Sequence, residues 1–219
     1  MAAECQRLGG SLGRSGGGRA LLIAGRNAVL VTLPGSGWCE VSAGSSGVAR
    51  RTFMDVTPRV ELLRQRPGAR PEDMHAIIVQ ISAWSVSGPG ADLVTARERL
   101  LETVAREMTS PAPSRELEWM ALPRRMGRAP DIGPIDAATH CFPMTHAGVV
   151  PGTVRQFEMD ARFCQPPGRQ ATAMIMTLQE WTQGDAMASR RAAAFRATVG
   201  EIFRSVQVIP VEELPGVAR

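Results

Sequence analysis

The sequence predicts a single α+β domain in which a curved antiparallel sheet is layered with two main helices. Three observations indicate this class. The chain has 219 residues, of which 44% are hydrophobic and 21% are charged, as in ordinary globular proteins. Short segments with alternating apolar residues are separated by turn residues, and two longer segments repeat apolar residues at helical spacing. Because strands and helices do not alternate regularly, a doubly wound nucleotide-binding fold is disfavoured.

The first 27 residues are rich in glycine, serine and arginine, which predicts a flexible N-terminal extension, residues 1–27. The α+β domain is expected to span residues 28–210, and residues 211–219 are expected to form a C-terminal tail. The first strand of the domain is expected at "AVLVTLP". After it, "ARRTFMDV" and "VELLR" are expected to continue as extended segments.

The strongest strand signal of the N-terminal half is "MHAIIVQISAWSV". Both faces of this strand are at least half apolar, which predicts a central position in the sheet. An amphipathic helix follows, with Asp92 as its N-cap. Its expected inner stripe contains Leu93, Arg97, Leu100, Leu101, Val104 and Met108. "RELEWMALP" is then expected to return as a strand that carries Trp119.

The C-terminal half begins with a segment rich in proline, glycine and methionine, residues 124–151, in which "ATHCF" predicts a short strand. "TVRQFEMDARF" and "ATAMIMTLQEW" then predict the two strands of an antiparallel hairpin. A final helix is expected from about Asp185 to Val206. Its expected buried residues are Phe195, Val199, Ile202, Phe203 and Val206.

The charge is distributed unevenly along the chain. The net charge is +4, and residues 1–51 carry six arginines and two acidic residues, so this region accounts for all of it. The rest of the chain is electrically balanced, which argues against a large nucleic-acid-binding face. There is no lysine, which excludes Schiff-base and P-loop chemistry.

The four cysteines, Cys5, Cys39, Cys141 and Cys164, lie far apart and include no CxxC pair. We therefore expect reduced, partly buried thiols rather than a disulfide framework or a structural zinc site. No apolar run approaches the about 20 residues that a membrane-spanning helix needs, and no clean secretory signal is visible. The sequence accordingly predicts a cytoplasmic protein without a membrane-inserted segment.

The order of elements resembles that of the PsbP/DcrB-like families. It combines a "GW" near an early strand, a mid-chain amphipathic helix, a long hairpin with alternating faces and a closing helix that ends "FRATVGEIFRSVQV". The resemblance covers roughly residues 28–210 and rests on topology. It implies a curved antiparallel sheet between helices and a non-enzymatic role, as a lipoprotein, an assembly factor or a secretion-associated chaperone. The lipoprotein branch needs a signal peptide and a lipid-bearing cysteine, which the sequence does not show.

In the chaperone branch, the resemblance implies that a sheet face shields an apolar helix of a secreted client protein. The outward residues expected to bind the partner are amides and indoles, which suit such a role: Gln80, Trp84, Gln156, Gln179 and Trp181. Replacing Trp84 or Trp181 by alanine should then abolish partner capture without loss of folding. The competing interpretation is that both tryptophans are core residues beneath a helix or loop.

The stretch "DAATHCFPMTH" holds two histidines and a cysteine and suggests an alternative function. His140, Cys141 and His146 could form a metal site, or a thiol enzyme oriented by Asp136. However, neighbouring strand residues point to opposite faces, so His140 and Cys141 do not converge on a regular strand. Glu158 and Asp160 share one strand face, and we expect a solvated edge of the hairpin there rather than a glycosidase pair.

The sequence therefore favours a non-catalytic accessory or chaperone-like protein without a cofactor. Its expected partner is another protein, and a homodimer remains open.

Overall fold

The computed structural model describes residues 1–12, 18–24, 26–35, 37–41, 50–69, 75–84, 92–111, 119–165 and 172–214. In chain order its elements are α1 (Ala2–Arg7), β1 (Gly10–Leu12), β2 (Arg19–Ala24), β3 (Asn27–Thr32), β4 (Trp38–Val41), β5 (Arg50–Asp55), α2 (Thr57–Gln65), β6 (Ala76–Trp84), α3 (Leu93–Thr109), α4 (Ala121–Met126), β7 (Asp131–Ile132), β8 (Cys141–Val149), β9 (Arg155–Cys164), β10 (Thr172–Thr182), α5 (Ala186–Arg204), β11 (Gln207–Pro210) and the 3₁₀ turn η3 (Val211–Glu213).

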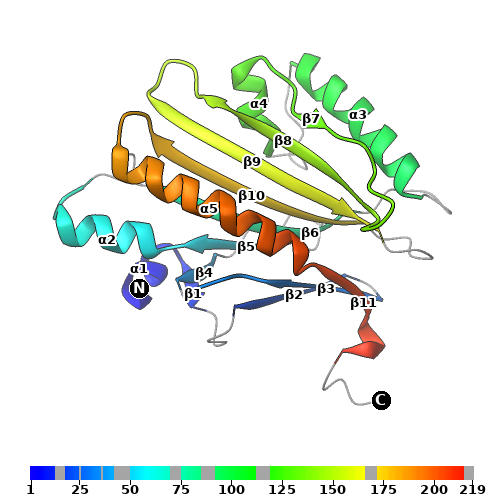
Figure 1. The fold of residues 1–219 in the computed structure, drawn as a ribbon, viewed down its shortest axis with the longest axis horizontal. Coiled ribbons are helices and arrows are strands. Elements are labelled where there is room, and N and C mark those ends of the chain that lie inside the picture. Colours follow the sequence, from blue (N-terminus) through cyan, green and yellow to red (C-terminus); the bar gives the residue numbers. More distant parts are fainter. Residues whose placement is uncertain are drawn as a thin grey trace.

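The main feature is an eight-stranded sheet in the order β1-β4-β5-β6-β10-β9-β8-β7. Its described strand pairs are antiparallel, and the sheet is strongly curved (Figure 1). β6 pairs with β5 on one side and β10 on the other, which confirms its predicted central place. The predicted hairpin is also confirmed, because β9 and β10 pair along ten residues of each strand. The chain therefore has the predicted α+β fold.

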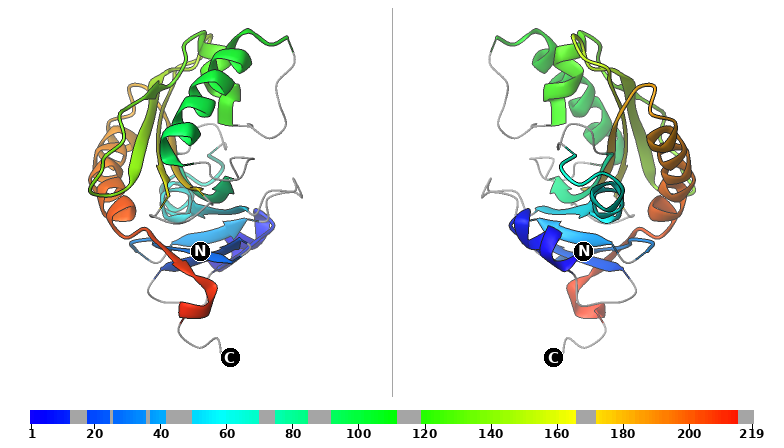
Figure 2. Two further views of the ribbon diagram at one scale, coloured as in Figure 1. Left: turned by 90° about the vertical axis from the view of Figure 1, so that its right-hand side faces the viewer. Right: turned by 90° about the vertical axis from the view of Figure 1, so that its left-hand side faces the viewer.

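Each face of the curved sheet is covered by a layer of other elements (Figure 2). α5 and a second sheet, in the order β11-β3-β2, cover one face, and α3 and α4 cover the other. Each layer has its own hydrophobic core. The first core joins residues of the small sheet and α5, such as Val31 and Ile202, to Val79 and Ile175 of the large sheet. The second joins α3 and α4 to the face that carries Phe142, Phe157 and Phe163.

Both long helices begin where the sequence predicts. The Asp92 carboxylate accepts a hydrogen bond of 2.8 Å from the Thr95 N–H, and Asp185 caps α5 in the same way. One predicted inner residue is wrong: Leu101 is 40% exposed, because α3 buries the stripe of Leu93, Ala96, Leu100 and Val104 instead.

Two segments predicted as extended are helical. "VELLR" lies in α2, which has a proline in its first turn and buries Pro58 and Leu62 one helical turn apart. The described end of "RELEWMALP" forms a helical turn and α4, which ends at Gly127 with φ 64°. Both segments are short, and a run of a few apolar residues fits a strand or a helix equally well.

The region predicted as a flexible extension, residues 1–27, contains α1, β1 and β2 in its described part. β2 pairs with β3 along six residues and buries Ala20 and Leu22 in the first core. A disulfide between Cys5 and Cys39 holds α1 to β4. Glycine-rich composition alone does not reveal such tertiary contacts. Near the other end of the chain, β11 pairs with β3 after the last helix.

Candidate functional site

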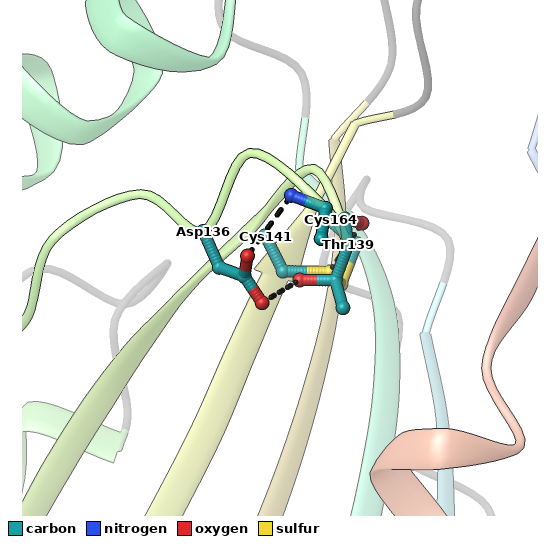
Figure 3. Close-up of a disulfide and its surroundings, with 5 residues drawn as sticks. Asp136, Thr139, Cys141 and Cys164 are labelled. Atoms are coloured by element: carbon teal, nitrogen blue, oxygen red, sulfur yellow. Dashed lines mark hydrogen bonds between the residues drawn. A yellow bond between two sulfur atoms is a disulfide. The ribbon is translucent and has the colours of Figure 1, made fainter.

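The stretch from Asp136 to His146 is built around a disulfide rather than a free thiol. Cys141 at the start of β8 and Cys164 at the end of β9 lie directly opposite each other, with their Cα atoms 4.1 Å apart and their sulfur atoms bonded (Figure 3). All four cysteines are paired, so the expectation of reduced thiols is wrong. Spacing along the chain does not predict pairing, which depends on where the fold brings two cysteines together.

The three residues of the alternative centre do not converge. His146 is 4% exposed and packs its ring against Phe157, with ring centroids 5.3 Å apart. It lies an odd number of residues from Cys141 on β8, and therefore on the opposite face of the sheet. His140 is exposed in the turn before β8, with φ 50°. The hypothesis of a thiol enzyme at Cys141 is wrong, because its sulfur is consumed in the disulfide.

Asp136 has a structural role in this turn (Figure 3). Its carboxylate accepts hydrogen bonds from the Ala138 N–H at 2.9 Å and the Thr139 hydroxyl at 2.8 Å. The Thr139 bond is the main cause of a lowered pKa of Asp136. Across the described part of the chain, no three histidine, cysteine or acidic side chains are grouped so that they could hold a metal ion.

The residues predicted to bind a partner do not share one exposed face. Gln179 and Trp181 on β10 are 2% and 3% exposed, and Trp181 packs against Ala188 and Ala192 of α5. Gln156 is opposite Trp181 on β9 and is half-buried. The face expected for a client helix is therefore covered here by α5, a helix of the chain itself.

Gln80 lies on the other face of the sheet. On β6 it pairs with Met176, whose side chain belongs to the core beneath α3 and α4. Trp84 follows four residues later on β6 and its backbone pairs with Thr172, but its side chain lies outside the described residues. The expectation of a common face is wrong because the antiparallel register places Gln80 and Gln179 on opposite sides of the sheet.

Gln179 is instead the centre of a buried polar network beneath α5. Its side-chain NH₂ donates to a carboxylate oxygen of Glu158 at 2.8 Å and to the main-chain carbonyl of Ala192 at 3.3 Å. Its side-chain oxygen lies 3.1 Å from Nε2 of His75. Since that oxygen can only accept, His75 must carry its proton on Nε2, and its Nδ1 is left buried without a partner among the described residues.

The network continues to α5 through an ion pair. The Arg196 guanidinium donates to both carboxylate oxygens of Glu158, at 2.7 and 2.5 Å, and lies over the Trp181 ring at 5.7 Å from its centroid. The hydrogen bonds to Glu158 are the main cause of a raised pKa of Arg196. Such a two-point pair fixes both side chains in position.

Beside this ion pair, the surface opens into a groove of about 660 Å³, which we call the α5 groove. This volume lies in the range of about 300–1,000 Å³ that is usual for ligand sites. Its walls come from the segment before and at the start of β7, from β8 and β9, and from α5. The lining residues are Arg128, Ala129, Asp131, Thr145, His146, Ala147, Glu158, Met159, Asp160, Arg196 and Val199.

Asp160 is a partly buried charged group of the groove, and the positive charges of Arg162 and Arg196 act on it without a direct bond. It stands opposite Thr145 across β8 and β9, two residues from Glu158 and on the same face. Its carboxylate has no ion pair or hydrogen bond among the described residues, and the Thr177 hydroxyl donates to its main-chain carbonyl instead. Burial, and then the negative charge of Glu158, raise the pKa of Asp160.

Among the described residues, the groove presents charged side chains held in place, and no side chain of it forms a nucleophile–base pair. The Thr145 hydroxyl has no hydrogen bond to a base among the described residues, and the ring of His146 packs on the other side of the sheet. Nucleophilic catalysis needs such a bonded pair. Sequence reasoning placed Glu158 and Asp160 at a solvated hairpin edge and did not select Arg128, Asp131 or Arg196. The alternating polar face of "QFEMDAR" was the available signal for a polar sheet surface.

No described helix is both long and apolar enough to cross a membrane.

No protein-family model matches the chain, and no curated protein matches it. Among solved structures, LpqN, described as involved in cell envelope biogenesis of Mycobacterium tuberculosis, is similar with a TM-score of 0.42 at 10% sequence identity. The match covers 90% of this chain and 93% of LpqN. A likeness at this level assigns neither family nor function, and the resemblance to PsbP/DcrB-like families stays a prediction.

Proposed function

We propose that the protein is a non-catalytic accessory protein that binds a partner protein at the α5 groove. The observation that carries this proposal is the fixed ion pair of Glu158 and Arg196, which forms one wall of an open groove beside the unpaired carboxylate of Asp160. Groups that are held in place before binding lose little conformational freedom when a partner docks. The groove thus replaces the covered face of Gln179 and Trp181 as the binding surface.

We also propose that the protein works in an oxidising compartment rather than in the cytoplasm. Two disulfides, Cys5–Cys39 and Cys141–Cys164, support this location, because cytosolic reductants keep most protein thiols reduced. Alkylation of thiols in intact cells before lysis tests it. Full protection of all four cysteines from alkylation is the expected result, and complete labelling would place the protein in a reducing compartment.

The binding proposal is tested with a variant that fills the groove. Thr145 is exposed on the groove surface, so Thr145→Trp should block the groove while the fold is kept. A partner is captured from native extract on the oxidised chain, identified, purified and titrated against each variant. We expect a stoichiometric complex with the wild type that Thr145→Trp weakens at least about tenfold.

The control is Thr103→Trp, which places the same side chain on α3, away from the groove lining. It should bind the partner like the wild type. Equal affinity of the wild type and Thr145→Trp would exclude the groove as the binding surface. Sedimentation of the purified wild-type chain alone shows whether the partner is a second copy of it.

A further inference from the structure

We propose that the α5 groove binds a cationic side chain, arginine or lysine, on an extended segment of the partner. This inference rests on the proposed function and specifies the chemistry of the bound segment. It follows from the charge balance of the groove, from the free carboxylate of Asp160 and from the open edge of β8.

The groove is acidic although the chain is basic. Its lining contains three acidic residues and two arginines, a net charge of −1, whereas the whole chain carries +4. The charge of Glu158 is compensated by Arg196 within the groove. The remaining acidic groups are Asp131 and Asp160, and the remaining arginine is Arg128, which is bound to the main-chain carbonyl of Ala147 at 2.5 Å.

Asp160 is the group that a ligand cation would contact. Its carboxylate is partly withdrawn from water, and no side chain of the described residues bonds to it. A guanidinium or ammonium group placed there would supply the missing hydrogen-bond donors and the opposite charge, and charge-assisted hydrogen bonds are the strong ones. Asp131 borders the same groove and adds to the attraction.

The rest of the groove suits the aliphatic part of such a side chain. Ala147 and Val199 contribute apolar surface to the lining near the charged groups. The stems of arginine and lysine bury readily along apolar surface while their charged ends stay in polar surroundings. A long cationic side chain can therefore use both the apolar wall and the carboxylate.

The edge of β8 indicates that the segment which carries the cation is extended. β7 pairs with β8 only at Met144 and Thr145, so β8 continues beyond its neighbour. The Val150 N–H bonds to β9, which leaves the main-chain groups of Ala147 and Val149 pointing toward the open side. The Ala147 carbonyl is occupied by Arg128, but the Ala147 N–H and the main-chain groups of Val149 have no such bond among the described residues. An extended main chain could pair with these groups.

The test uses the full, oxidised, ¹⁵N-labelled chain and three capped pentapeptides. Each peptide has one central residue between alanines: arginine, its neutral isostere citrulline, or glutamate. Binding is followed by the amide signals of Thr145, Ala147 and Asp160. We expect the arginine peptide to shift these signals and to bind at least about tenfold more tightly than the citrulline and glutamate peptides.

Two variants locate the effect on the protein. Asp160→Asn keeps the size of the side chain and removes its charge, and it should weaken binding of the arginine peptide to the level of the citrulline peptide. Glu201→Gln removes a charge from an exposed position of α5 outside the groove lining and should leave binding unchanged. The comparison of peptides on the wild type stands even if Asp160→Asn does not fold.

Equal binding of the arginine and citrulline peptides, tighter binding of the glutamate peptide, or signal changes away from the groove would overturn this inference. The same holds if no peptide binds. In each of these cases the proposed function survives if Thr145→Trp still weakens the captured partner. If Thr145→Trp binds the partner as tightly as the wild type does, the proposed function itself is wrong, whichever peptides bind.

Discussion

Cys141 and Cys164 are direct neighbours across two antiparallel strands, and their bond closes one end of the β8–β9 pair, whose central residues line the α5 groove. The main-chain bond from the Gln165 N–H to the His140 carbonyl, 3.0 Å long, extends the same pairing by one step. The disulfide therefore fixes the register of the two strands that carry Thr145 and Asp160.

Loss of this disulfide should lower the stability of the whole chain. Cys141→Ser combined with Cys164→Ser should reduce the free energy of unfolding by about 2–4 kcal/mol, mainly because the unfolded chain gains freedom. Denaturant unfolding of the wild type and the double variant under oxidising conditions measures this difference. A wild type whose unfolding midpoint does not change on addition of a reductant would contradict both the prediction and the disulfides.

Removal of Arg196 should destabilise the protein moderately. Arg196→Ala leaves the Glu158 carboxylate with only the Gln179 amide, and it also removes the cation above Trp181. Because Arg196 is half-exposed, we expect a loss of about 1 kcal/mol, near the upper end for surface pairs. Arg190→Ala is the matched control, since Arg190 is exposed on α5 and should change stability by less than about 0.5 kcal/mol. Equal effects would show that the ion pair is not formed.

Trp181→Ala should damage folding rather than binding alone. The side chain is 3% exposed beneath α5, and truncation of a buried tryptophan costs about 3–5 kcal/mol. This prediction differs from the expectation based on sequence, in which the variant stays folded and loses only its partner. Thermal unfolding followed by circular dichroism measures it, with Trp181→Phe as a milder control. An unchanged melting temperature of Trp181→Ala would place Trp181 outside the core.

The buried His75 should make stability fall at acidic pH. Burial is the main cause that lowers its pKa below 6.5 in the folded chain. The unfolded chain therefore binds a proton more readily between that lowered pKa and about 6.5, so the stabilising effect is complete above about pH 6.5 and is lost as the pH falls below it. His146 has a lowered pKa for the same reason, burial, and acts in the same direction.

Unfolding free energies measured from pH 7 down to pH 5 test this expectation. His75→Gln can still donate a hydrogen bond toward Gln179 and should flatten the decrease, whereas His140→Asn, at an exposed position outside the core, should keep it. An identical pH dependence in the wild type and His75→Gln would show that His75 is not the residue responsible.

Asp160→Asn should stabilise the chain near neutral pH. Burial and the charge of Glu158 raise the folded-state pKa of Asp160, so its ionised form opposes folding above that pKa. The gain of the variant should shrink as the pH falls toward 4, where the wild-type carboxyl is itself neutralised. Melting temperatures at pH 7 and pH 4 measure the difference. A destabilised variant at pH 7 would mean that the carboxylate is compensated in the folded protein.

Local sequence patterns determined much of the fold. The alternation in β6, β9 and β10 and the helical spacing in α3 and α5 identify the central strands and both long helices, because these patterns reflect burial on one face. Asp92 and Asp185 also mark the starts of their helices, since an N-cap needs only neighbouring main-chain groups. Short apolar runs such as "VELLR" do not distinguish a strand from a helix, and there the prediction was wrong.

The site, by contrast, was decided by tertiary structure. Cys141 meets Cys164, and Arg196 meets Glu158, only because antiparallel pairing and the return of α5 bring distant segments together. The same register sends Gln80 and Gln179 to opposite faces. The sequence by itself determined the central strands and the two long helices, since these depend on periodic burial within one segment. Which side chains face each other, and therefore where the chain can bind, depended on strand register and helix docking, which no local pattern encodes.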